Sequence, residues 1–380
     1  MDLIQTYKNA FERDSELIHL NNAGVSPWPR NTESLVQAWT SRMASEGTHG
    51  IAAAVEKSEE TRGRLGSVLG ALPTQIAFFQ TCASAISQVA FGLTLELGDE
   101  IIVWDQEYPS NFYPWKLAAD RAGAKLVIAS STDTLATPLE NIEKVLTPRT
   151  RVIAVSWVQY RNGAVMDIQG LATLAKARGI FTCVDIIQGA GLLPFDFIAS
   201  GIDAACGGSH KWFTSPLALG FLILKPEHIE TLTPLSVGAM SFGGFDVLSN
   251  VDTPMAKGTQ RFEPGGRSII ELVGFGETLK LVASVGVDRI GQEAEWLSRR
   301  LMHGLRELGY VIHSPHGAHH RGAIVNFSPT PQTAAKTFEE IEKRLSVAQV
   351  SFSKRAPGIR LSPHAFLIAK QIDRVLTVLS

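Results

Sequence analysis

The sequence predicts an α/β protein with a large domain on a mostly parallel sheet and a smaller α+β domain towards the C-terminus. Short apolar runs alternate with helix-like stretches through the first two thirds of the chain, as in buried parallel sheets. A glycine-rich and polar segment follows, and the last third combines long helical patterns with two short strand candidates. A chain of 380 residues is also long enough to form more than one hydrophobic core.

The predicted strands of the large domain are continuous apolar runs, and the helices between them carry spaced apolar residues. The strands are expected at 101–104, 126–129, 152–157, 181–184 and 220–224, with helices such as 111–122 and 168–178 between them. In such a sheet, ligands bind beyond the carboxyl ends of the strands.

The last third has a different pattern, with helices expected at 268–283 and 286–308, strands at 323–327 and 358–361, and a closing helix at 368–379. We therefore expect a large domain over 21–250 and a small domain formed by 1–20 and 251–380.

The charge balance excludes partners that are recruited by bulk charge. Lys and Arg total 35 and Asp and Glu total 37, which gives no electrostatic case for nucleic acid or a membrane surface. The N-terminus carries charges throughout, unlike a signal peptide. No apolar run approaches the roughly 20 residues that span a bilayer. Three cysteines are too few for a disulfide framework. We expect a cytoplasmic protein.

Two polar side chains follow predicted strands. Asp185 comes directly after one strand, with Gln188 three residues later; read alone, such an Asp is more often a helix N-cap. Lys211 follows the strand-like run at 202–206 and then Gly207, Gly208, Ser209 and His210; read alone, such a lysine is more often a solvated surface residue. The alternative for each is a functional group held in a pocket.

A third segment, at 82–84, passes from a strand end through small residues into an amphipathic helix, and helix N-termini bind anions. Pyridoxal 5'-phosphate (PLP) requires three parts: a lysine that can form a Schiff base, an acidic side chain, and a helix start that can bind phosphate. The acid keeps the ring nitrogen protonated. We therefore expect PLP on Lys211 and an amino acid as substrate.

These residues resemble those of fold-type I PLP enzymes of the class V aminotransferase group. That group includes cysteine desulfurases, cysteine/cystine C–S lyases, isopenicillin N epimerase-like proteins and some transaminases. The resemblance rests on D-x-x-Q at 185–188, S-H-K at 209–211, RFEPGG at 261–266 and GIRLSPH at 358–364. It implies an aspartate aminotransferase-like PLP-dependent transferase fold for the large domain.

The resemblance also implies a role for each matching residue. Lys211 would carry the cofactor as an internal aldimine and shuttle the Cα proton, Asp185 would pair with the pyridine nitrogen, and Gln188 would contact the phenolic oxygen of the ring. Arg360 would hold the substrate carboxylate, for which a guanidinium fork is well suited. Asn22 lies in the segment that usually lines the substrate pocket.

The phosphate site departs from the family pattern. His210, Cys82 and Ala83 match its phosphate-contacting positions, with only the backbone N–H available at Ala83. The family's serine three residues before the lysine is Gly208 here, and Ser209 is the candidate replacement. We expect Arg267, next to the position of a threonine that reaches across the dimer, to supply phosphate charge from the neighbouring subunit of a homodimer.

The ring-contacting positions differ too. In EYPSNFYPW, Tyr108 is the expected stacking ring, with an offset of one residue left open, and Gln159 or Tyr160 replaces the asparagine that touches the ring oxygen.

Desulfurases need a nucleophilic cysteine before the carboxylate arginine, and no cysteine follows Cys206. The corresponding stretch offers Ser351 and Ser353, so a persulfide-forming desulfurase is not expected. Reactions through an external aldimine remain open: transamination, ranked slightly ahead, β-elimination by a C–S lyase, and epimerisation. A non-catalytic PLP-binding protein ranks last.

Four histidines at 313–320 invite a metal interpretation, but they lie in a glycine-containing loop without a carboxylate nearby. A solvated loop is favoured, and no metal site is expected.

Overall fold

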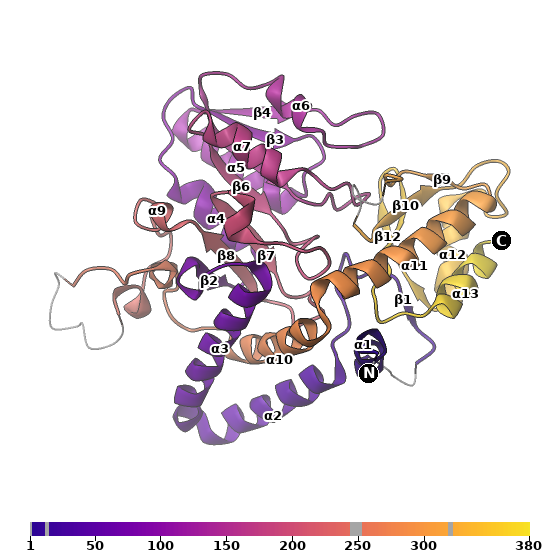
Figure 1. The fold of residues 1–380 in the computed structure, drawn as a ribbon, viewed down its shortest axis with the longest axis horizontal. Helices are drawn as coiled ribbons and strands as arrows, with labels where there is room; N and C mark the ends of the chain where they lie inside the picture. The colour runs from indigo at the N-terminus through magenta and orange to yellow at the C-terminus, as the bar shows by residue number, and fades with distance from the viewer. Residues whose placement is uncertain (1, 12–14, 244–252, 318–321) are drawn as a thin grey trace.

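The computed structural model describes residues 2–11, 15–243, 253–317 and 322–380. A large sheet surrounded by helices forms one body, and a small sheet covered by helices forms another (Figure 1). Across the described ranges, no helix has the length and apolarity that a membrane span requires.

The large sheet has seven strands and confirms the predicted mostly parallel architecture. Strand β8 is antiparallel to both of its neighbours, β2 and β7, and every other pairing is parallel. In spatial order the strands are β2 (Ile76–Phe79), β8 (Gly220–Leu224), β7 (Ala204–Gly208), β6 (Phe181–Asp185), β5 (Thr150–Ser156), β3 (Glu100–Trp104) and β4 (Lys125–Ala129).

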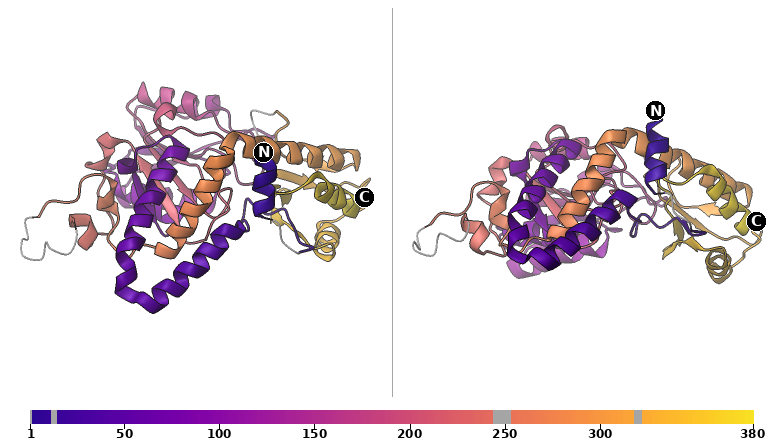
Figure 2. Two further views of the ribbon diagram at one scale, coloured as in Figure 1. Left: turned by 60° about the horizontal axis from the view of Figure 1, so that its bottom comes forward. Right: turned by 90° about the horizontal axis from the view of Figure 1, so that it is seen from below.

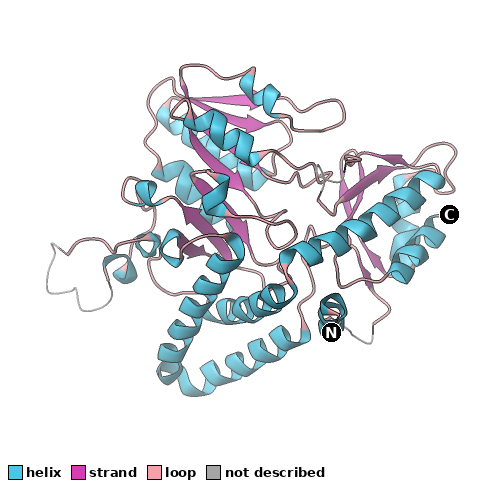
Figure 3. Ribbon diagram, viewed as in Figure 1, coloured by secondary structure: helices cyan, strands magenta, loops and turns pink. Residues whose placement is uncertain are grey.

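Helices cover both faces of this sheet because its strands are apolar on both sides (Figure 3). In β3, Ile101 and Val103 join one buried cluster while Ile102 and Trp104 join the other, as the two-residue period of a strand requires. The first cluster includes α4 (Cys82–Gly92) and α5 (Pro109–Ala122); the second includes α3 (Ile51–Leu69), α7 (Ile168–Lys176) and α10 (Ile269–Val285).

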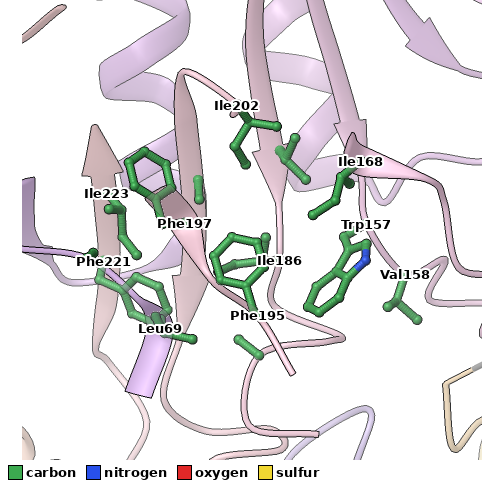
Figure 4. Packing of buried hydrophobic residues seen from close by; sticks show 14 of the residues in the cluster. Leu69, Trp157, Val158, Ile168, Ile186, Phe195, Phe197, Ile202, Phe221 and Ile223 are labelled. Carbon is green, nitrogen blue, oxygen red and sulfur yellow. The ribbon is translucent and has the colours of Figure 1, made fainter. Parts of the chain in front are cut away.

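Large aromatic and branched side chains fill the second cluster. Phe195 and Trp157 pack with ring centroids 5.2 Å apart, and Phe197, Ile202 and Phe221 lie around them (Figure 4). Four further helices complete the large body: α2 (Arg30–Glu46), α6 (Leu139–Glu143), α8 (Phe197–Ser200) and α9 (Pro226–Ile229).

The small body is an antiparallel sheet with helices on one face. Its strands are, in order, β12 (Ser353–Arg355), β13 (Gly358–Leu361), β10 (Val325–Ser328) and β9 (Val311–Ile312). Leucine, isoleucine and valine side chains of three helices form its core with the sheet. These helices are α11 (Val287–Glu307), α12 (Phe338–Val347) and α13 (Ala369–Leu379).

The N-terminal segment contacts both bodies. Strand β1 (Ile18–His19) pairs in parallel with β11 (Val350–Ser351), and Lys8 of α1 (Leu3–Ala10) forms an ion pair with Glu293 of α11. Tyr7 also belongs to the core of the large sheet. Figure 2 accordingly places α1 at the junction of the two bodies.

Helix α10 packs against α2 and α3 of the large body. The expected boundary between 250 and 251 lies outside the described residues, so the domain limits stay a prediction.

Candidate active site

The carboxyl ends of β6 and β7 and the start of α4 meet at one cavity of about 430 Å³. Asp185, Lys211 and Arg360 all line it, although they are far apart in the sequence. The cavity therefore lies where a mostly parallel sheet is expected to bind its ligand.

Lys211 is buried in the loop that follows β7. The backbone N–H of Thr214 donates to the carbonyl of Lys211, and the N–H of Ser215 donates to that of Ser209. Thr214 has a φ of 54°, a conformation that is uncommon for a β-branched residue and costs energy. The loop is thus held in a strained turn that directs Lys211 into the cavity.

Burial lowers the pKa of Lys211 to about 8, since the ammonium form loses its hydration; the Asp185 carboxylate opposes this shift and the Arg360 guanidinium adds to it. The uncharged amine is the form that attacks a carbonyl. The uncharged, reactive form of Lys211 is therefore the minor form at pH 7, but it is far more populated than in a lysine with the usual pKa.

Asp185 is the last residue of β6 and is buried. Its Oδ1 accepts the backbone N–H of Ile187 at 2.9 Å and the thiol of Cys82 at 3.6 Å. Burial raises the pKa of this carboxyl, while the Ile187 hydrogen bond and the Lys211 charge lower it. The carboxylate is thus placed to pair with a cationic group in the cavity.

Helix α4 points its N-terminus at the cavity. Thr81 is its N-cap, with Oγ1 accepting the N–H of Ser84 at 3.0 Å, and Thr81, Cys82 and Ala83 line the cavity. Gly220 lies so close that a Cβ there would sit 2.2 Å from the carbonyl carbon of Thr81. The free N–H groups of this first turn form an anion site.

Gln188 and Trp212 fix each other behind the cavity. The indole N–H of Trp212 donates to Oε1 of Gln188 at 2.9 Å, and Nε2 of Gln188 donates to the carbonyl of Ala23 at 3.0 Å. Because an indole nitrogen can only donate, the amide orientation of Gln188 is determined. Gln188 also lines the cavity, so its second N–H is available to a ligand.

Tyr108 and Tyr160 form one wall of the cavity. Their rings meet edge to face at a centroid distance of 5.0 Å, and Nζ of Lys211 lies 5.5 Å from the centre of the Tyr108 ring. An aromatic face beside the reactive amine is suited to stack on a flat ring.

Arg360 extends from β13 into the cavity and is buried. Nη1 donates to the carbonyl of Tyr160 at 2.8 Å, and Nη2 donates to Oδ1 of Asn21 at 3.2 Å. Its Nε is buried without a partner among the described residues. Burial and the charge of Arg355 lower its pKa to about 10. An unsatisfied buried donor on a cation indicates an anionic ligand.

Three predicted site residues do not line this cavity. The Ser209 hydroxyl donates to the Pro216 and Leu219 carbonyls. Asn22 donates to the Ser362 carbonyl and accepts from Ser26, so it anchors the N-terminal segment.

Arg267 lines a separate cavity of about 270 Å³ that reaches Ser84. It forms ion pairs with Glu59 and Glu263, which compensate its charge within one chain. Its expected action across a dimer stays a prediction.

Several residues of the site were missed. Thr81, Asn21 and Arg355 contribute to the cavity or to its arginine. The S/T-x-x pattern before α4 is a capping signal that could have indicated Thr81.

Glu107 is buried behind the cavity, where it accepts hydrogen bonds from Ser156 and Asn111, and burial raises its pKa to about 7. No sequence pattern distinguishes it from a surface glutamate.

The cysteines and the described histidines of the 313–320 segment show no arrangement that would bind a metal. Cys82, Cys183 and Cys206 are free and buried. His313 contacts Ser328 and His316 contacts Arg306, whereas His319 and His320 lie outside the described residues. Over the described ranges, no group of three His, Cys, Asp or Glu side chains could hold a metal.

The cavity fits PLP. The α4 N-terminus and His210, kept neutral because burial and the Lys211 charge lower its pKa to about 4, would hold the phosphate. Asp185 would pair with the ring nitrogen, Gln188 would face the ring oxygen, and Lys211 would form the covalent bond. The unpartnered Nε of Arg360 remains for a substrate carboxylate.

Known proteins resemble this chain over nearly its full length. The family model described as "Aminotransferase class-V" matches residues 18–348. An isopenicillin N epimerase of Streptomyces clavuligerus is 26% identical, with 96% of this chain and 95% of the relative covered. A probable cysteine desulfurase of Pyrococcus abyssi is 24% identical, with 83% and 79% covered.

A solved structure of a C-DES variant with glycine covalently linked to PLP has a TM-score of 0.90 at 21% identity and covers 98% of both chains. This likeness confirms the predicted fold.

Proposed function

Because the chain belongs to the class V aminotransferase family, whose members use PLP, we propose that this enzyme is a C–S lyase that performs β-elimination on a sulfur-containing amino acid. The observation that carries the proposal is one cavity with the Lys211 amine, the unpartnered Nε of Arg360 and, among its described lining residues, only the buried cysteine Cys82, whose thiol donates to Asp185. The relatives named as cysteine desulfurases and the similar solved structure named as the cystine C–S lyase C-DES favour cleavage at sulfur over transamination, which the sequence had ranked slightly ahead.

The chain's own residues bind the substrate and move its proton. Arg360 binds the α-carboxylate through Nε, held in place by Asn21 and the Tyr160 carbonyl. The Lys211 amine, with its pKa lowered to about 8, removes the proton from Cα. PLP, when bound, supplies the electron sink, which Asp185 supports by keeping the ring nitrogen charged.

The elimination breaks the Cα–H and Cβ–S bonds. The sulfur leaves with the bonding electrons and receives a proton, and one water is consumed as the remaining three-carbon fragment gives pyruvate and ammonia.

Sulfur would be released as a small molecule because the chain lacks a suitable acceptor. Cys82 borders the cavity, but its thiol donates to Asp185 and its pKa is raised well above the usual value by burial, so it is a poor nucleophile. Ser353, in the stretch where desulfurases carry the nucleophilic cysteine, has a hydroxyl in place of a thiol, and this hydroxyl donates to Oδ1 of Asn21 at 2.6 Å.

The test is a screen of the holoenzyme with L-cysteine, L-cystine and S-alkyl cysteines, with pyruvate, ammonia and thiol assayed together. Equal amounts of pyruvate and ammonia, without keto-acid-dependent turnover, are expected. A protein persulfide after incubation with L-cysteine, or amino-group transfer to added keto acids, would replace β-elimination with desulfuration or transamination.

Lys211→Ala should be inactive. Lys116→Ala is the matched lysine control and should keep its activity, because Lys116 lies exposed on α5 and pairs with Asp120.

Epimerisation is a second candidate because the epimerase relative aligns over 96% of this chain. It requires a proton donor on the face of the ring opposite Lys211. Deuterium uptake at Cα from D₂O with inversion, and without pyruvate, would identify it.

We also propose a cytoplasmic homodimer. The cavity between Arg267 and Ser84 is the expected place for a contribution from a second subunit. Light scattering that gave a fully active monomer would contradict the shared phosphate site.

A further inference from the structure

The hairpin of β12 and β13 brings two arginines to the cavity that holds Lys211. In its register Ser353 pairs with Arg360, and Arg355 pairs with Gly358. Alternate residues of a strand share a face, so Arg355 lies on the same face as Ser353, whose hydroxyl accepts from Arg360 at 3.4 Å. The two guanidinium groups therefore face one ligand space.

Lys354 has a different environment on the other face of the same strand. It forms ion pairs with Glu342 at 3.1 Å and Glu339 at 3.9 Å. Arg355 is partly buried and donates to the Lys354 carbonyl, but in the part of the chain that the structure describes no carboxylate forms an ion pair with it. The protein neutralises the outward cation and leaves the inward one without a counterion.

The cavity therefore has an excess of positive charge. Lys211, Arg355 and Arg360 line it, and Asp185 is the acidic side chain among its described lining residues. The charge of Arg355 lowers the pKa of both Lys211 and Arg360, as like charges do. An α-carboxylate satisfies Arg360, and the phosphate of PLP is assigned to the start of α4. Neither accounts for Arg355.

We propose that Arg355 is a specificity-determining residue that binds a second carboxylate, carried by the side chain or leaving group of the substrate. The substrate class is then a dicarboxylic amino acid; this inference rests on the proposed function for the reaction that follows binding. A guanidinium binds carboxylates through two parallel hydrogen bonds.

Space for such a substrate exists beyond Arg355. Ala356 and Pro357, the next residues of the hairpin, line a second cavity of about 570 Å³ together with Arg161. Tyr160, the neighbour of Arg161, lines the first cavity. The second space therefore borders the residues that follow Arg355 and Tyr160 along the chain.

Binding of unreactive ligands to the holoenzyme tests the inference without turnover. Calorimetry would compare glutarate with its monoamide, which has the same shape and one charge fewer. The wild type should bind glutarate at least about tenfold more tightly. Arg355→Met should remove this preference, Arg355→Lys should restore part of it, and Lys354→Met should leave it unchanged.

Turnover provides the second readout. S-(carboxymethyl)-L-cysteine and S-(carbamoylmethyl)-L-cysteine differ in one charge, and the acid should show at least about tenfold higher kcat/KM, mainly through KM. Arg355→Met should remove that advantage. Equal binding of the two ligands by the wild type, or a preference that survives in Arg355→Met, overturns the inference. If neither these substrates nor those of the cysteine and cystine screen yield pyruvate, the β-elimination proposal fails, and the glutarate comparison still decides the role of Arg355.

Discussion

The indole N–H of Trp212 donates to Oε1 of Gln188, so the residue after the candidate PLP lysine orients the amide that faces the same cavity. The contact joins the loop after β6 to the loop after β7. It connects the D-x-x-Q and S-H-K motifs physically.

Trp212→Phe should preserve most of the packing but remove the donor that orients Gln188. The Gln188 amide could then rotate, and its N–H would no longer be fixed towards the ring oxygen of PLP. We expect a fivefold to roughly tenfold fall in kcat and a shifted visible absorbance maximum. An unchanged spectrum in a folded Trp212→Phe protein would show that the contact has no role in the cofactor site.

Asp185→Asn should bind PLP but lose at least about 100-fold in kcat, because the neutral amide cannot stabilise a protonated ring nitrogen. Reconstitution with a PLP analogue that is N-methylated, and therefore permanently cationic, should recover part of the activity. Full activity of Asp185→Asn with ordinary PLP would contradict the assignment.

Gly220→Ala should weaken the phosphate site, since the new Cβ would meet the Thr81 carbonyl and the Cys82 nitrogen within 2.5 Å. We expect the affinity for PLP to fall at least about tenfold while that for pyridoxal, which lacks the phosphate, changes little. Gly63→Ala in α3 is the control, because nothing lies within 4 Å of its added Cβ. Equal loss for both ligands would argue for general unfolding.

The rate of PLP uptake by the apoenzyme should depend on the ionisation of Lys211. With a folded pKa of about 8, the uncharged amine increases as the pH rises from about 7 to about 9 and levels off above that. Asp185 raises this pKa, so in Asp185→Asn the midpoint should move to lower pH. A rate that keeps rising towards pH 10.5, as for an exposed lysine, would contradict a desolvated Lys211.

The sequence predicted the mostly parallel sheet and the residues at its carboxyl edge, because both depend on residue type and on order along the chain. Asp185 and Lys211 meet in one cavity because apolar strands followed by polar residues define the carboxyl edge of a sheet, whereas Arg360 reaches this cavity from β13 of the small sheet and was indicated by the family resemblance. The antiparallel direction of β8 was not predictable, because a run that is apolar on both faces carries no information about direction.

Contacts between distant segments were also beyond the sequence. Asn21, the neighbour of the predicted pocket residue Asn22, accepts a hydrogen bond from Arg360, and this contact depends on the path of the N-terminal segment beside Ser362. The pairing of Arg267 with Glu59 joins residues about 200 positions apart, and nothing local indicates it.

The central claim is that Lys211 bonds covalently to PLP. Borohydride reduction of the holoenzyme followed by peptide mass spectrometry tests it most directly. We predict a phosphopyridoxyl group on Lys211, which is lost together with the visible absorbance in Lys211→Ala and retained in Lys116→Ala. A label on another lysine, or an unchanged spectrum in Lys211→Ala, would contradict the account.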